Sequence, residues 1–133
     1  MTVERIDGHR LIEFGDDAEM RDRLLDFVFN GNKRATAAML EYDYDEDEPV
    51  ESVGEIFILV GNENQPVGKI EITRVDVVRF DEVSDEFALA EAEGDLSGDD
   101  FRNSHRAFWE GCGYEVKPDS MVVCAYFELL EKY

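Results

Sequence analysis

The segment 31–36 reads GNKRAT and places the amine of Lys33 three positions before the hydroxyl of Thr36. A hydroxyl is a weak nucleophile that attacks a carbonyl carbon only with a base beside it. A neutral lysine could be that base, whereas a charged lysine would stabilise a developing oxyanion. The same positive charge could instead cap the C-terminus of the preceding helix, an interaction worth about 0.3–1 kcal/mol. The spacing leaves both interpretations open.

A second group of residues could bind a ligand rather than react with it. Arg102, His105 and Arg106 share one predicted helix, and arginine binds phosphate through two parallel hydrogen bonds. The alternative is that these arginines pair with acidic residues three or four positions away on that helix. Tyr42 could stack on a nucleobase or pack against protein. Arg34 would place another positive charge beside the lysine. These five residues are the candidate substrate-binding set.

The elements that carry these groups follow from apolar spacing and turn residues. The helices are expected to begin after the side-chain caps Asp16, Ser84 and Ser97. A break in the apolar alternation near Thr73 indicates a β-bulge, which is common in small barrels. Helices are predicted over 17–30, 85–92 and 98–111, and strands over 11–14, 35–43, 55–60, 67–78 and 121–130. The residues of 36–44 also fit a short helix, but we favour the strand. This order predicts one α+β domain over 1–133, built on a mixed, curled sheet.

Composition bounds what the protein can bind. Asp and Glu number 33 against 13 Lys and Arg, which gives a net charge of −20. Such a charge repels long nucleic acid, duplex DNA included, but allows a local positive pocket for a nucleoside or a short RNA. Cys112 and Cys124 lack metal-site spacing, so neither a metal nor a cofactor is expected.

Targeting signals are also missing from the sequence. No apolar run approaches the roughly 20 residues that span a bilayer. The first ten residues are polar and lack the apolar segment of a signal peptide. We therefore expect a cytoplasmic protein with no membrane partner.

Short motifs follow the first segment in a fixed order. They are VGE (53–55), FDEV (80–83), FA (87–88), EAEGD (91–95), FRxxHxxF (101–108) and PDxMVVCxxF (118–127). Taken together over about residues 10–133, they resemble the ASCH (activating-signal-cointegrator homology) domain family in its stand-alone bacterial form. One position departs from the family, which usually has tryptophan where this chain has Phe101. The resemblance implies a PUA-like small mixed β-barrel with flanking helices, and a cleft suited to RNA or a modified nucleoside.

The resemblance also implies an activity. Small members of the family include an amidohydrolase that acts on 4-acetylcytidine, and others have been assigned ribonuclease activity. The amidohydrolase roles carry over to Lys33, Thr36 and a later glutamate, either Glu93 or Glu91. We expect a hydrolase of an acylated pyrimidine nucleoside with Lys33, Thr36 and Glu93 as catalytic residues. The alternatives are a PUA-like module that binds RNA without turnover, and a ribonuclease.

Two catalytic schemes follow from these residue types. In the favoured scheme Thr36 is the nucleophile and Lys33 is its base. In the other, Lys33 stays charged and stabilises the oxyanion, while Glu93 activates a water or protonates the leaving amine.

Overall fold

The computed structural model describes residues 5–15 and 17–133 of the chain. Its elements are β1 (Arg5–Ile6), β2 (His9–Ile12), α1 (Ala18–Phe29), β3 (Ala35–Met39), β4 (Ile56–Val60), η1 (Asn62–Asn64), β5 (Pro66–Arg79), η2 (Phe80–Glu82), α2 (Asp85–Glu91), α3 (Gly98–Gly111) and β6 (Met121–Lys132). None of the helices in this part of the chain is both long and apolar enough to cross a membrane.

All six strands form one mixed sheet in the order β1-β2-β4-β5-β6-β3. Neighbouring strands are antiparallel, except that β2 and β4 run parallel. The α+β class is confirmed, but the expectation of a closed barrel is wrong. Within the described residues β1 and β3 lie at opposite ends of the strand order and do not pair, so the sheet stays open.

The bulge near Thr73 is confirmed. In the long antiparallel pair of β5 and β6, Ile72 lies opposite Phe127 and Arg74 lies opposite Tyr126. Thr73 is therefore the extra residue on β5, and an extra residue bends a strand and increases its local twist.

Side-chain caps begin the three α-helices. Ser84 and Ser97 each accept a hydrogen bond from a backbone N–H three residues later, as the sequence predicts. The cap of α1 is Asp17, whose Oδ1 accepts from the N–H of Met20 at 2.8 Å. The predicted cap, Asp16, lies outside the described residues.

The strand predicted over 35–43 is too long. β3 ends at Met39 because Asp43 folds back onto it. The backbone N–H of Asp43 donates to the oxygen of Met39, and its Oδ2 accepts from the Met39 N–H at 2.7 Å. Tyr42 therefore lies in a turn rather than on the sheet.

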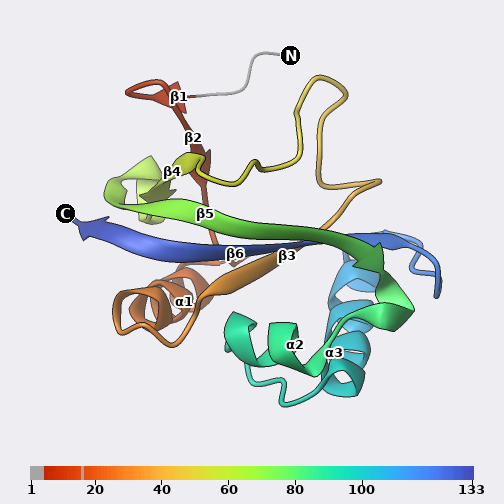
Figure 1. The fold of residues 1–133 in the computed structure, drawn as a ribbon. Helices are drawn as coiled ribbons and strands as arrows, with labels where there is room; N and C mark the ends of the chain where they lie inside the picture. Colours follow the sequence, from red (N-terminus) through yellow and green to blue (C-terminus); the bar gives the residue numbers. More distant parts are fainter. Residues whose placement is uncertain (1–4, 16) are drawn as a thin grey trace.

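The helices lie under the two halves of the long strand pair. Figure 1 shows α1 beneath one end of β5 and β6, and α2 and α3 beneath the other end. Each arrangement encloses its own buried apolar cluster. β6 contributes to both clusters, with Val122 and Cys124 in the one beside α2 and α3, and Ala125 and Phe127 in the one beside α1.

Candidate functional site

Lys33 follows α1, where the chain reverses direction. Gly31 has a φ of +86°, a left-handed conformation that favours glycine and ends the helix. The turn directs the lysine side chain inward, where it has no exposed surface. Its ammonium donates to the oxygens of Ala35 at 2.9 Å and Glu91 at 3.1 Å, and to Oε2 of Glu93 at 2.8 Å.

These contacts bear on both interpretations of the lysine. An ammonium has three N–H donors, and each of them meets an acceptor here. Lys33 is therefore held as a cation, which favours the scheme in which it is charged over the one in which it is the base. Its side chain does not cap α1 either. The carbonyl of Glu91 is at the C-terminal end of α2, so the positive charge stabilises that helix end instead.

The end of α2 separates the two candidate glutamates. Glu91 is the last helical residue and is buried, and Ala92 then takes a left-handed conformation with φ 55° and ψ 36°. After this turn the carboxylate of Glu93 faces Lys33, whereas Oε1 of Glu91 lies 3.2 Å from Nε2 of His105. Both glutamates line one cleft, so the structure includes both in the candidate site.

A cleft of about 590 Å³ lies between α1, β3 and α3. Thr36 and Glu93 both line it, and Lys33 lies behind Glu93 through their hydrogen bond. The hydroxyl of Thr36 makes no hydrogen bond to any residue that the structure describes. The lining includes the aromatic residues Phe14, Tyr44, Phe57, Phe108, Trp109 and Tyr114, and the acidic residues Glu13, Asp43, Glu48, Glu51, Glu91, Glu93 and Asp95.

His105 reaches the cleft from α3, with each ring nitrogen beside an acceptor. Nε2 faces Glu91, while Nδ1 lies 3.1 Å from the oxygen of Phe101 and 3.6 Å from Oδ2 of Asp95. Burial lowers the pKa of His105. The interaction with Glu91 and the charges of Glu91, Glu93 and Asp95 raise this pKa by more than burial lowers it, so the pKa lies above its ordinary value. Burial raises the pKa of Glu91.

Glu91, Asp95 and His105 are also close enough to surround a cation, since one ligand atom from each lies within 4.8 Å of the others. A histidine binds a metal through a nitrogen lone pair. Here Nδ1 points toward the oxygen of Phe101, and Nε2 points toward Glu91. Nδ1 is placed to act as an N–H donor, and Nε2 faces a carboxylate oxygen at 3.2 Å, so the arrangement favours a polar network over a metal centre.

The two arginines of α3 are engaged within the fold. Arg102 forms an ion pair with Asp99 at 2.6 Å, the local pairing that the sequence left open. Arg106 lies over the ring of Phe80 at 5.0 Å and donates to the oxygen of Val116 at 3.2 Å. Neither arginine lines the cleft, so the structure does not bring them to His105 as one basic cluster.

Tyr42 lies against another tyrosine. Its ring stacks on Tyr114 with a centroid separation of 4.4 Å and an interplanar angle of 7°. The stacking covers one face of the Tyr42 ring. Tyr114 lines the cleft, whereas Tyr42 does not. Among the residues that the structure describes, His105 lines this cleft, and the other four candidate binding residues do not.

Comparison with known proteins places the chain in a family. A family model described as the ASCH domain matches residues 10–131. The chain belongs to the ASCH domain family. An ASCH domain from Lactobacillus crispatus is 26% identical, with a TM-score of 0.77 over 91% of this chain and 79% of that one. A protein from Enterococcus faecalis is 31% identical, with a TM-score of 0.79 over 91% of this chain and 76% of that one. None of the curated proteins matches significantly.

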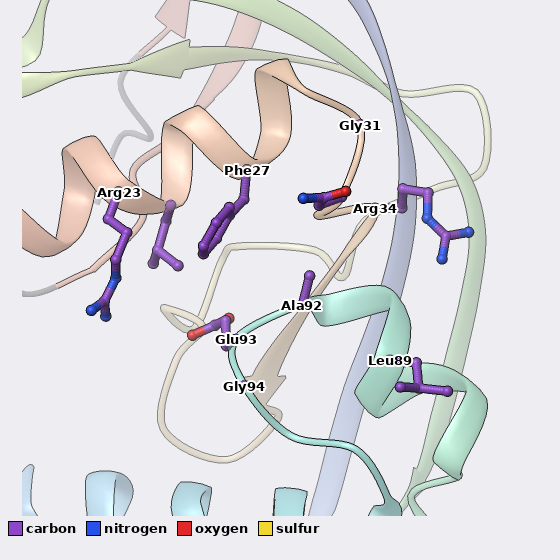
Figure 2. Close-up of a pocket in the computed structure, with 10 residues that line it drawn as sticks. Arg23, Phe27, Gly31, Arg34, Leu89, Ala92, Glu93 and Gly94 are labelled. Carbon is purple, nitrogen blue, oxygen red and sulfur yellow. The ribbon is translucent and has the colours of Figure 1, made fainter.

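This ASCH domain has a second cavity of about 700 Å³, between the C-terminal half of α1 and the turn that follows α2. Figure 2 shows Arg23 and Arg34 on opposite sides of it, with Glu93 between them. Neither guanidinium forms an ion pair with an acidic residue in the described part of the chain. Arg23, Leu24 and Glu93 line both cavities, so the two share a wall.

Sequence reasoning did not place Asp95 or Arg23 in the ASCH-domain site. Asp95 is two positions after Glu93, and the intervening Gly94, with φ +100°, turns it toward α3, where the hydroxyl of Ser104 donates to it at 2.8 Å. The alternating acidic residues of EAEGD (91–95) are the local signal that could have placed Asp95 near the two glutamates. Arg23 is one helical turn before Phe27, so the period of α1 would have placed it on a shared face.

Proposed function

We propose that this ASCH domain is a hydrolase that cleaves the amide of an acylated pyrimidine nucleoside such as 4-acetylcytidine. The observation that carries the proposal is the convergence of a hydroxyl and a carboxylate on one cleft, with a buried ammonium fixed to that carboxylate. Thr36 and Glu93 line the cleft, and Lys33 binds Glu93 at 2.8 Å. Acyl transfer requires a nucleophile, a proton carrier and a nearby positive charge, and these residue types supply all three.

The geometry supports a revised division of roles. Thr36 attacks the acyl carbon, and Glu93 accepts the proton of its hydroxyl. Lys33 orients Glu93 and contributes the positive charge that favours the anionic intermediate. The acyl group then leaves Thr36 when water attacks the ester, and Glu93 returns its proton to the threonine oxygen. This cycle consumes one water and restores both side chains.

The shape and charge of the cleft support a small, uncharged substrate. Its volume of about 590 Å³ falls in the range of small-molecule sites, roughly 300–1,000 Å³. Rings such as Tyr44, Phe108 and Tyr114 in its wall suit a planar base. The carboxylates around them repel phosphate, so a nucleoside fits this cleft better than a polynucleotide.

Turnover of 4-acetylcytidine tests the proposal directly. Purified protein should release cytidine, measured by chromatography. Thr36→Val and Glu93→Gln should each lower the rate by at least about 100-fold, while Thr36→Ser, which keeps the hydroxyl, should retain activity. If wild-type protein leaves 4-acetylcytidine and other acylated pyrimidine nucleosides intact, the proposal is wrong.

A second candidate function, binding of short RNA without turnover, is favoured by the cavity in Figure 2. Arg23 and Arg34 line it, and arginine is suited to phosphate. In this case a short single-stranded RNA should bind, and its affinity should fall with salt. Arg23→Ala and Arg34→Ala should weaken the binding, whereas Arg79→Ala should not, because Arg79 is paired with Asp81 away from the cavity.

A further inference from the structure

We propose that Glu91 and His105 share one mobile proton, that Asp95 holds this pair in place, and that the pair is the proton source for the leaving group in the cleft. The last part rests on the proposed hydrolase. The first two parts concern the fold itself and can be tested without any substrate. Glu91 is the proton donor at the cleft, and His105 and Asp95 act through it as positioning residues.

The hydrogen-bonding pattern of His105 identifies which ring nitrogen can exchange its proton. Nδ1 lies 3.1 Å from the backbone oxygen of Phe101, an acceptor that has no proton to give. It also lies 3.3 Å from Oγ of Ser104, whose hydrogen is directed to Asp95, so Nδ1 keeps its own hydrogen. Nε2 lies 3.2 Å from Oε1 of Glu91, and a carboxyl can either give or take a proton. The mobile proton therefore belongs to the line between Nε2 and Oε1.

Asp95 supports this arrangement from the other side of the ring. Its Oδ2 lies 3.6 Å from Nδ1, and both its oxygens accept from the hydroxyl of Ser104, at 3.0 and 2.8 Å. The imidazole is thus bracketed by two carboxylates, a buried one at Nε2 and a hydrogen-bonded one at Nδ1. A negative charge at Nδ1 favours the charged ring, as in other histidines held by a carboxylate.

Aromatic rings pack against the imidazole of the pair. The ring of His105 stacks on Phe101 at 3.8 Å and 19°, and its other neighbour is the edge of Trp109 at 5.1 Å. Glu91 is only 2% exposed, and its Oε1 has no partner with full hydrogen-bond geometry in the described structure. A buried carboxylate without a strong partner is costly, so a shared proton relieves this cost.

Charged groups from each neighbouring element act on the pair. Lys33, from the turn before β3, favours the ionised form of Glu91, whereas Glu93 disfavours it. Glu93 and Asp95, from the segment after α2, both favour protonated His105. Cys124, on β6, also interacts electrostatically with Glu91, and burial keeps this thiol protonated. The opposing effects leave the proton available to either member of the pair.

The proton balance closes over one turnover. The pair gives its proton to the departing nitrogen and is left as a Glu91 carboxylate beside a neutral His105. The water that hydrolyses the threonine ester supplies a hydroxyl to the acyl group and a proton to the Glu91 carboxylate. Glu91 and His105 therefore begin the next cycle with the same single proton.

Ring-nitrogen NMR of His105 tests the shared proton in the folded protein without substrate. Nδ1 should stay protonated from about pH 5 to pH 9, Nε2 should titrate, and the pKa should lie above that of a histidine in a peptide. Glu91→Gln and Asp95→Asn should each move this titration to lower pH. Asp99→Asn, on the same helix as His105 with an 88% exposed side chain, should not.

Activity measurements test the role of the pair in turnover. Glu91→Gln should lower the rate by at least about 100-fold, as loss of a general acid does. Asp95→Asn should move the alkaline limb of the kcat/KM profile to lower pH, by the same amount as the NMR titration. A structural role alone would lower kcat without moving that limb.

Three results would overturn the inference. One is a neutral His105 that carries its hydrogen on Nε2 throughout the pH range. Another is an Asp95→Asn variant whose titration and pH profile match those of the wild type. The third is tight binding of Zn²⁺ or Mn²⁺ by Nε2, which would make the cluster a metal site. Failure to hydrolyse nucleosides, with the NMR prediction intact, would instead refute the proposed function and the proton-donor role, and leave the shared proton established.

Discussion

The Nζ atom of Lys33 lies 2.8 Å from Oε2 of Glu93, and the lysine side chain is fully buried while that of Glu93 is 29% exposed. The cation also satisfies the backbone oxygens of Ala35 and Glu91. Its removal leaves three acceptors without their donor. The pair is therefore as much a part of the fold as of the candidate site.

Replacing this lysine should destabilise the domain. We expect Lys33→Met to lower the free energy of unfolding by about 3 kcal/mol, since one partner of a buried pair is left uncompensated. Urea denaturation at neutral pH measures the loss. The matched control is Lys117→Met, where an exposed pair with Glu115 is removed, and its effect should stay within about 0.5 kcal/mol. Equal effects of the two variants would contradict the buried position of Lys33.

A second ion pair gives a dependence of stability on pH. Arg10 is buried and donates to both oxygens of Glu55 at 2.7 Å, and to the oxygen of Pro49. Burial raises the pKa of Glu55. The hydrogen bonds from Arg10 and from the Ser52 N–H lower this pKa by more than burial raises it, so the pKa lies below its ordinary value. A lowered pKa in the folded state stabilises the protein above the unfolded pKa of about 4.3, and this stabilisation is lost as pH falls through the folded value.

The measurement compares wild-type protein with Glu55→Gln from pH 7 to pH 3. The wild type should be more stable at pH 7, and the difference between the two free energies of unfolding should narrow below about pH 4. A constant difference over this range would show that the charge of Glu55 contributes nothing.

Two glycines of α3 offer a matched pair of substitutions. A Cβ atom at Gly98 would overlap the backbone oxygen of Val83, whereas one at Gly111 would meet nothing within 4 Å. Gly98→Ala should therefore destabilise the domain by about 1–3 kcal/mol through overpacking. Gly111→Ala should be neutral or stabilise it by about 0.5 kcal/mol, because alanine favours the helix. Thermal or urea unfolding measures the change in stability for each variant. A Gly98→Ala variant as stable as the wild type would contradict the close approach of α3 to Val83.

The two cysteines should differ sharply in reactivity. Cys112 is exposed and lines the cleft, while Cys124 is buried on β6. Burial raises the pKa of Cys124 to about 12, and the thiolate is the reactive form. A thiol reagent should modify Cys112 in the folded protein and Cys124 only after unfolding, as mass spectrometry would show. A nucleoside bound in the cleft should slow the reaction of Cys112, which makes it a reporter of occupancy.

Local signals in the sequence predicted much of the fold. Ser84 and Ser97 cap their helices through bonds that span three residues, so their types and spacing were sufficient. Thr73 interrupts an otherwise regular alternation, and that interruption is the bulge. The pair Asp7-Gly8 is a further local signal in the sequence. Asp7 and Gly8, with φ of 53° and 82°, form the kind of turn that joins β1 to β2.

Long-range partners could not be predicted from residue types. Two of the three acceptors of Lys33 come from the end of α2 and the turn after it, up to 60 positions away, so only the family resemblance connected these groups. Arg106 had Glu110 four positions away on its own helix but donates to Val116 and packs on Phe80. The open sheet also depends on long-range pairing, because β2 joins β4 in parallel although more than 40 residues separate the two strands along the chain.

The position of β6 determines when the domain can fold. This strand supplies side chains to both apolar clusters and is the only partner of β3 within the described sheet. During synthesis it emerges after all the other strands, so neither cluster can close until then. Pairing between segments so distant along the chain is slow, and the growing polypeptide carries exposed apolar surface in the meantime. Expression of this domain should therefore benefit from slower translation or added chaperone.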